Sequence, residues 1–181
     1  MARSLSILLP VHNVQSVLSR QVEHVLELVG ELTHQFEILI LDDGSYDHTT
    51  EVATELALRY PQIDVMRNNA RGGLKQLVER GLERCVGEVV IVHDGTGKWD
   101  PLGIRQLWHR RDDPALVMAR NPLAQGWYLL RKRGLESMTP KERLLAVDHE
   151  IRIIRADLVR GGQEPSRRPK SFSHLQQVVG Q

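Results

Sequence analysis

The apolar positions of this chain fall into short runs, separated by longer stretches in which apolar residues recur at helical spacing. Short apolar runs of this kind are typical of strands buried on both faces of a sheet. Five runs predict strands in this way: Leu5–Leu9, Phe36–Leu41, Ile63–Met66, Val89–Val92 and Ala115–Ala119.

The stretches between these runs predict amphipathic helices, because their apolar residues recur every three or four positions. Asn and Asp are good helix caps, Gly permits a tight turn into a helix, and Pro suits a first turn. The expected helix starts are therefore the caps Asn13 and Asp47, the pair Gly72-Gly73, and Pro101.

This order of elements predicts an α/β fold with a mostly parallel central sheet and helices on both faces. We expect one domain over residues 1–160. Residues 161–170 are rich in Gly, Pro, Ser and Arg, and we predict a basic, mobile tail over residues 161–181. Two segments before the tail are less regular: Gln125–Thr139 is predicted as a loop or short helix, and Ile151–Ile154 as a strand.

Composition narrows the class of protein. The 181 residues carry a formal net charge of +1 and only 4% aromatic residues, which excludes a basic or base-stacking surface for nucleic acid. No apolar run reaches the roughly 20 residues of a membrane span, and the N-terminus lacks the pattern of a signal peptide. A single cysteine, Cys85, suits a buried thiol in a reducing compartment. We therefore expect a cytoplasmic protein.

Acidic residues follow two of the predicted strands directly. Asp42 and Asp43 end one strand before Gly44, and Asp94 follows another. Parallel sheets bind ligands at the carboxyl ends of their strands, so these carboxylates are candidates for binding a base N–H or a ribose hydroxyl. The alternative is that a carboxylate caps the turn that follows its own strand.

Four segments resemble the family-2 glycosyltransferases. Leu5–Asn13 is similar to the family's opening strand, which usually continues into Pro-x-Tyr-Asn-Glu. Ile40–Thr49 nearly matches its Val-Asp-Asp-Gly-Ser-x-Asp-x-Thr segment. Asn69–Gly81 looks like the Gly-rich start of a helix, and Gly87–Pro101 resembles the Asp-Ala-Asp-Gly segment of polyprenyl-phosphate mannose and glucose synthases.

The resemblance implies a GT-A-type fold that binds a nucleoside-diphosphate sugar, in cell-wall or polysaccharide biosynthesis. Carried over by position, Pro10, Val11 and Asn13 would border the nucleoside, and Asp42 or Asp43 would contact the base or ribose. Lys75 is a candidate for positive charge near the phosphates, although a solvated helix face is the alternative.

The resemblance also implies a divalent cation, Mg²⁺ or Mn²⁺, held by an Asp-x-Asp motif whose first acid is Asp94. Asp94 is accordingly the catalytic candidate. The motif reads Asp94-Gly95-Thr96, so the second metal position has a neutral hydroxyl in place of a carboxylate. A hydroxyl is a much weaker ligand than a carboxylate for a hard cation.

The implied acceptor is a polyprenyl phosphate or a saccharide. A phosphate acceptor is already ionised and needs no general base, and the sequence identifies none. Trp127-Tyr128 and the basic residues after them could contact an anionic membrane surface, although a solvated loop is the alternative.

Two further hypotheses remain open. The chain could be a degenerate GT-A domain that binds a nucleotide or a partner protein without turnover, as Thr96 favours. It could instead be a phosphorylation-controlled receiver domain, which also has an acidic pair after a strand, but the lysine expected after a late strand is not evident.

Overall fold

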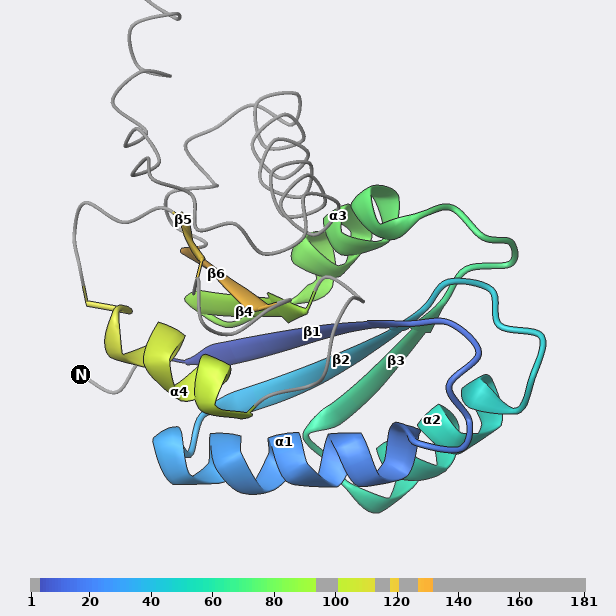
Figure 1. Ribbon diagram of the computed structural model, residues 1–181, viewed down its shortest axis with the longest axis horizontal. Helices are drawn as coiled ribbons and strands as arrows, with labels where there is room; N and C mark the ends of the chain where they lie inside the picture. The colour runs from blue at the N-terminus through green and yellow to red at the C-terminus, as the bar shows by residue number, and fades with distance from the viewer. Residues whose placement is uncertain (1–3, 94–100, 113–117, 121–126, 132–181) are drawn as a thin grey trace, which may run out of the picture.

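The computed structural model describes residues 4–93, 101–112, 118–120 and 127–131. In this part of the chain, six strands and four helices alternate as predicted up to α4 (Figure 1). They are β1 (Leu5–Val11), α1 (Leu18–Leu32), β2 (Phe36–Asp42), α2 (Thr49–Arg59), β3 (Ile63–Arg67), α3 (Leu74–Arg84), β4 (Val89–His93), α4 (Pro101–His109), β5 (Met118–Arg120) and β6 (Trp127–Arg131).

The strands form one sheet in the order β3-β2-β1-β4-β6-β5. The first four are parallel to one another, whereas β6 runs antiparallel to both β4 and β5. The chain therefore builds outward from β1 through β2 to β3, and then returns to place β4 on the other side of β1. The predicted mostly parallel sheet is confirmed.

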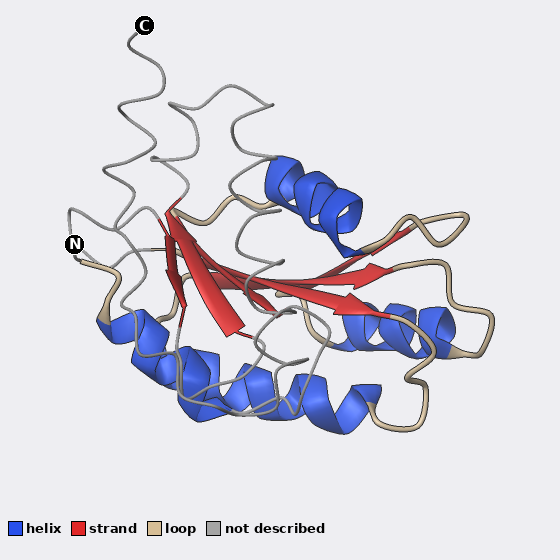
Figure 2. Ribbon diagram, turned by 45° about the horizontal axis from the view of Figure 1, so that its top comes forward, coloured by secondary structure: helices blue, strands red, loops and turns tan. Residues whose placement is uncertain are grey.

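Helices cover both faces of this sheet, as predicted (Figure 2). Alternate residues of the central strands point to opposite faces. On β1, Ile7 and Leu9 pack in a core with side chains of α1, α2 and α4, while Leu8 packs in a second core with Leu77 and Val78 of α3. Because both faces are covered, the central strands read as continuous apolar runs.

Pro10 lies inside β1 rather than after it. The Leu5 N–H and the Val11 carbonyl bond on the β2 side, so strand alternation turns the Pro10 nitrogen toward β4. The pairing of β1 with β4 ends at Leu8, opposite Val92. The missing N–H of Pro10 therefore costs the sheet no hydrogen bond.

β3 is the outer strand on one side of the described sheet. On the β3 side, the even-numbered residues bond to β2, since the Ile38 N–H of β2 donates to the Gln62 carbonyl. The N–H of the odd-numbered Val65 therefore points away from β2. The Asp64 carboxylate accepts from the Val65 N–H at 2.8 Å and pairs with Arg84 of α3 at 2.6 Å. A charged side chain thus covers this part of the sheet edge.

One prediction about the strands was wrong. Trp127–Arg131, placed in a loop or short helix, forms β6, because antiparallel pairing with β4 supplies the hydrogen bonds that its mixed sequence does not indicate. The predicted strand Ala115–Ala119 overlaps β5, which spans Met118–Arg120, and residues 115–117 lie outside the described residues. Ile151–Ile154, the tail 161–181 and the boundary at residue 160 also lie outside them and stay predictions.

No helix in the described part of the chain is both long and apolar enough to cross a lipid bilayer.

Candidate functional site

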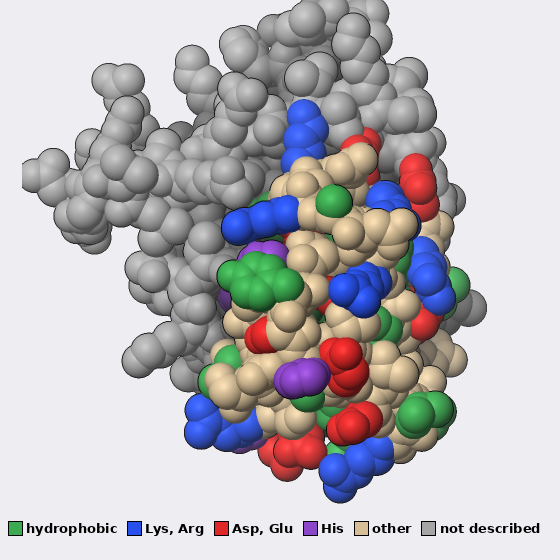
Figure 3. All heavy atoms as spheres, turned by 90° about the vertical axis from the view of Figure 1, so that its right-hand side faces the viewer, with side chains coloured by type: hydrophobic (Ala, Val, Ile, Leu, Met, Phe, Trp, Pro, Cys, Tyr) green, Lys and Arg blue, Asp and Glu red, His purple; other side chains and the backbone are tan. Residues whose placement is uncertain are grey.

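The carboxyl ends of β1, β2 and β4 lie next to one another in the sheet. Val11 of β1 is opposite Asp42 of β2, and β4 flanks β1 on the other side and ends at His93. Strand order reverses between β1 and β4, which is where open α/β sheets bind their ligands. Figure 3 views this end of the molecule, where acidic, basic and histidine side chains are interspersed.

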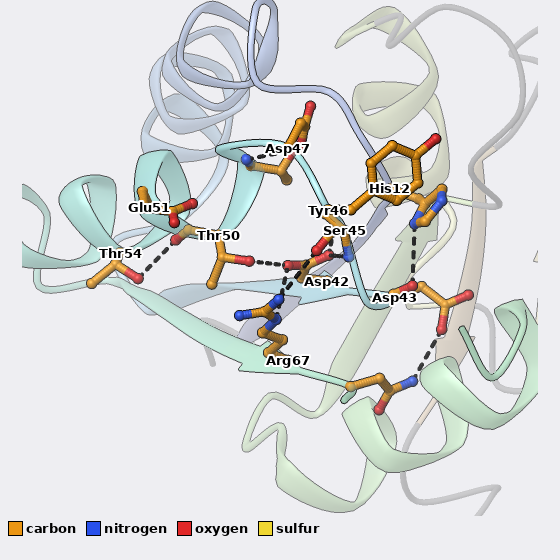
Figure 4. Close-up of polar contacts among 12 residues, drawn as sticks. His12, Asp42, Asp43, Ser45, Tyr46, Asp47, Thr50, Glu51, Thr54 and Arg67 are labelled. Carbon is orange, nitrogen blue, oxygen red and sulfur yellow. Dashed lines mark hydrogen bonds and ion pairs between the residues drawn. The ribbon is translucent and has the colours of Figure 1, made fainter. Parts of the chain in front are cut away.

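Asp42 is fully buried and ties the turn after β2 to its surroundings (Figure 4). Its Oδ1 accepts from the Ser45 N–H at 2.9 Å and from Ser45 Oγ at 2.6 Å. Its Oδ2 accepts from Thr50 Oγ1 and lies 3.8 Å from Nε of Arg67. For Asp42 the turn-capping alternative is what the structure shows.

Asp43 faces the other way and holds the loop that leads into α3. Its Oδ1 accepts from the Gly72 N–H at 2.8 Å and from Nδ2 of Asn68 at 3.1 Å, and its Oδ2 accepts from the Gly73 N–H at 3.0 Å. Burial alone would raise the pKa of Asp43, but the hydrogen bonds from Gly72, Asn68 and Gly73 and the charge interaction with His12 hold it below its ordinary value. The carboxylate is therefore kept ionised at the start of α3.

Gly44 brings the two loops into direct backbone contact. Its φ of +70° lies in the left-handed region, which residues with a Cβ atom rarely adopt. A Cβ at this position would lie 2.9 Å from the Ala70 carbonyl carbon and 3.0 Å from the Arg71 nitrogen. Glycine is thus required both for the conformation and for the close approach that lets Asp43 reach Gly72.

Asn13 does not cap α1, contrary to the prediction. The helix begins at Leu18, and Asn13 itself has a left-handed φ of 53°. Its backbone N–H donates to Ser45 Oγ at 2.9 Å, and its Oδ1 accepts from the Tyr46 N–H at 3.0 Å. The side chain is used instead to fasten the end of β1 to the turn after β2.

His12 is held in one tautomer by its neighbours. Its Nδ1 lies 3.2 Å from the Asp43 carbonyl oxygen, which can only accept, and its Nε2 lies 3.1 Å from Nδ2 of Asn13, which can only donate. Neutral His12 therefore carries its proton on Nδ1. The exposed Tyr46 ring meets the imidazole edge to face, with centroids 5.7 Å apart (Figure 4).

The structure brings most of the predicted nucleotide-binding residues together. Pro10 and Val11 end β1, and Asn13 follows them, beside Asp42 and Asp43. Lys75 is the second residue of α3, the helix whose start Asp43 holds. Asp94 and Thr96, the predicted catalytic and metal residues, lie outside the described residues.

His93, the residue before Asp94, is a buried polar side chain at the end of β4. Burial lowers the pKa of His93 from 6.5 to about 4, because the apolar surroundings disfavour the charged imidazolium. The imidazole is therefore neutral at physiological pH.

Sequence reasoning missed several residues that build this site. Thr49 Oγ1 accepts from the Val14 N–H at 2.8 Å, and Thr50, Arg67, Asn68 and Arg80 complete the networks around the two aspartates. Thr49 was within the quoted family segment and could have been singled out there. The other four carry no local pattern that separates them from ordinary surface residues.

Solved structures of GT-A glycosyltransferases share this fold. A mannosyltransferase from Pyrobaculum calidifontis in complex with GDP-Man and Mn²⁺ matches with a TM-score of 0.54 at 15% identity, over 75% of this chain and 46% of that one. Glucosyl-3-phosphoglycerate synthase from Mycobacterium tuberculosis in complex with Mn²⁺ and UDP-glucose matches with a TM-score of 0.57 at 18% identity, over 75% and 58%. The chain thus has the α/β fold of the GT-A glycosyltransferases, as predicted.

Sequence comparison defines the family. The model of glycosyl transferase family 2 matches residues 6–157, and the chain belongs to that family. An undecaprenyl-phosphate 4-deoxy-4-formamido-L-arabinose transferase from Pseudomonas syringae is 34% identical over 104 residues, and a dolichol-phosphate mannosyltransferase from Pyrococcus furiosus is 31% identical over 102. Each match covers 56% of this chain, but only 31% and 28% of the relative.

Proposed function

We propose that this chain is a hexosyltransferase that takes its sugar from a UDP- or GDP-sugar bound at the ends of β1, β2 and β4. The observation that carries the proposal is the ionised Asp43, which the two neighbouring loops hold beside the end of β1 in a family-2 glycosyltransferase chain. The nucleotide sugars named for structures of the same fold, GDP-Man and UDP-glucose, support this choice of donor.

The nucleoside would lie against Pro10, Val11 and Asn13. Asp43 is better suited than Asp42 to accept a base N–H or a ribose hydroxyl, because both Asp42 oxygens are committed to the turn and to Arg67. Asp42 would act by holding that turn in place. Lys75 would add positive charge from the first turn of α3.

Asp94 would hold a Mg²⁺ or Mn²⁺ ion, with Thr96 assisting through its hydroxyl. The donor chemistry fits a hard cation, since Asp94 offers carboxylate oxygens. No cluster of three or more His, Cys, Asp or Glu suitable for a metal occurs among the residues that the structure describes. When bound, the ion would supply positive charge to the departing diphosphate. The two neighbours described above were solved with Mn²⁺, which supports a divalent cation here.

The acceptor would be a lipid phosphate or a saccharide. In transfer, the bond between the sugar's anomeric carbon and the diphosphate oxygen breaks as the acceptor oxygen bonds to that carbon. A phosphate oxyanion could attack without a general base, which agrees with the absence of an identified base. The relatives named for undecaprenyl phosphate and dolichol phosphate favour a lipid acceptor. A cytoplasmic protein would reach such an acceptor through peripheral contact with the membrane.

A second candidate is a degenerate GT-A domain that binds a nucleotide or a partner protein without turnover. The sequence Asp94-Gly95-Thr96 favours it, because a neutral hydroxyl attracts a divalent ion less than a second carboxylate would. The transferase and a degenerate domain that binds nucleotide would both take up UDP or GDP, so metal dependence distinguishes them.

Calorimetric titration with UDP and with GDP, each with and without Mn²⁺, tests both candidates. For the transferase we expect one nucleotide to bind, more tightly with Mn²⁺. Binding that Mn²⁺ leaves unchanged would favour the degenerate domain. Failure of both nucleotides to bind a folded chain would end both nucleotide-binding accounts and leave only the partner-protein form of the degenerate domain. Glu55→Gln on the exposed face of α2 is a control for charge loss.

A further inference from the structure

We propose that Arg80 of α3 is a positioning residue that acts through Asn68 to orient the Asp43 carboxylate toward the nucleotide. The orientation toward a nucleotide rests on the proposed function, whereas the contacts themselves do not. Arg80 Nη1 donates to Asn68 Oδ1, and Asn68 Nδ2 donates to Asp43 Oδ1 at 3.1 Å. One chain of hydrogen bonds thus runs from a surface cation to the carboxylate.

Arg80 decides which way round the Asn68 amide lies. A guanidinium has only donors, so the amide oxygen must face Arg80 and the amide NH₂ must then face Asp43. In the reversed orientation, the amide oxygen of Asn68 would face the Asp43 carboxylate. Two buried oxygen acceptors would then meet with no hydrogen between them. Arg80 therefore selects the one orientation that supports an ionised Asp43.

The backbone of Asn68 is fixed by the sheet, so Arg80 can affect only the orientation of the Asn68 side-chain amide. The Asn68 N–H donates to the Asp42 carbonyl at 2.8 Å, which continues the pairing of β3 with β2, and the residue is buried. Hydrogen bonds in such a low-dielectric setting polarise one another, so a cation at one end strengthens the bond to the carboxylate at the other.

The arrangement leaves part of Asp43 available for a ligand. Oδ1 accepts two hydrogen bonds, from Asn68 and Gly72, while Oδ2 accepts one, from Gly73. Each carboxylate oxygen has two lone pairs, so within the described residues Oδ2 keeps capacity for one more donor. His12 is the titratable neighbour from the β1 side. The hydrogen bonds from Asn68, which Arg80 orients, and from Gly72 thus use the acceptor capacity of Oδ1, while Oδ2 can still accept from the base or ribose.

The test compares Arg80→Met with Arg84→Met in the full chain without nucleotide. Arg84 lies on the same exposed part of α3 and pairs with Asp64 at 2.6 Å, so it matches the loss of charge without touching Asn68. Carbon-13 NMR of the side-chain carboxyls would follow the titration of Asp43, assigned with Asp43→Asn. We expect the Asp43 midpoint to rise in Arg80→Met, to stay in Arg84→Met, and to be partly restored in Arg80→Lys.

Asn68→Asp is a second variant in case Arg80→Met does not fold. It keeps an oxygen for Arg80 but sets a carboxylate against Asp43, so the Asp43 midpoint should rise. An Asp43 midpoint that stays at its wild-type value in a folded Arg80→Met or Asn68→Asp chain would overturn the proposal, as would an equal rise in Arg84→Met.

Titration with UDP and GDP separates this proposal from the proposed function. If either nucleotide binds the wild type, Arg80→Met should weaken it about tenfold, the loss of one charge-assisted hydrogen bond, and Arg84→Met should not. If neither nucleotide binds the wild type while the NMR shift occurs, the positioning role of Arg80 stands and the nucleotide function fails. Equal weakening in both variants would refute the role of Arg80 in binding.

Discussion

The Asp43 carboxylate accepts a hydrogen bond from the Gly72 N–H at 2.8 Å, across 29 positions of sequence. Together with the bond from the Gly73 N–H, it places an anion directly before the first turn of α3, where the helix dipole favours negative charge. The loop after β3 is therefore shaped by a side chain that belongs to β2's turn.

We expect Asp43→Asn to destabilise the chain by about 1–3 kcal/mol, because an amide cannot accept at both of its terminal atoms and the N–H of Gly72 or Gly73 loses its charged acceptor. Chemical denaturation measures the change, and nucleotide titration of the folded fraction should show weaker binding. Glu55→Gln, on the exposed face of α2, should change neither quantity. Stability equal to wild type in Asp43→Asn would show that the bonds to Gly72 and Gly73 carry little energy.

Gly44→Ala and Gly30→Ala should have opposite effects on the free energy of unfolding. At Gly44, φ is +70° and an added Cβ would approach the Ala70 carbonyl carbon to 2.9 Å, so we expect a loss of about 1–3 kcal/mol. At Gly30, in the last turns of α1, nothing lies within 4 Å of an added Cβ. Alanine should stabilise that helix by up to about 1 kcal/mol. Thermal unfolding of the two variants measures the difference. Equal stability of Gly44→Ala and Gly30→Ala would show that the turn at Gly44 accepts a side chain.

His93 predicts a specific dependence of stability on pH. Its folded pKa, about 4, is below its ordinary 6.5, so protons bind the unfolded chain more readily between these values. The His93 contribution is fully present above pH 6.5 and is lost progressively as the pH falls toward 4, by about 3 kcal/mol in all. Denaturation at several pH values would measure the loss.

His93→Gln should flatten that part of the curve, while His34→Gln, an exposed site before β2, should leave it in place. Proton NMR gives an independent reading, because the His93 ring resonances should not shift between pH 7 and 5.5. A His93 ring that titrates near pH 6.5 in the folded chain would contradict the expectation.

Thr96→Asp should raise the affinity for Mn²⁺, because it restores a second carboxylate beside Asp94. The size expected is at least about tenfold, the effect of roughly 1.4 kcal/mol. Calorimetry with Mn²⁺ in the presence of the nucleotide measures it, and Thr54→Asp, an exposed site on α2, is the control for added charge. An unchanged titration in folded Thr96→Asp would remove residue 96 from the proposed metal site.

Local pattern accounts for the parallel half of the fold. The runs that became β1 to β4 are short and mostly apolar, and Gly73 and Pro101 mark helix starts that the structure confirms. β6 was not predicted as a strand because Trp127–Arg131 mixes apolar and charged residues in a short segment. Its identity depends on pairing with β4, 34 or more residues away, which no local pattern contains.

The roles of individual site residues were harder to predict. Asp42 and Asp43 are adjacent and chemically identical, yet one binds Thr50 and Arg67 while the other binds Asn68 and Gly72. Strand alternation sends the two side chains to different sides, and only the folded loops decide what each side offers. Asn13 was assigned to a helix cap for the same reason, since its actual partners Ser45 and Tyr46 are supplied by another strand's turn.

The covered edge at β3 bears on how this domain can meet other chains. A free outer strand invites an extended peptide or a second copy to add itself as a further strand. Here Asp64 already occupies the outward N–H of Val65 and is itself held by Arg84. A strand added at this edge would have to displace the Asp64 carboxylate and break its ion pair with Arg84. The chain's own side chains therefore oppose association through β3.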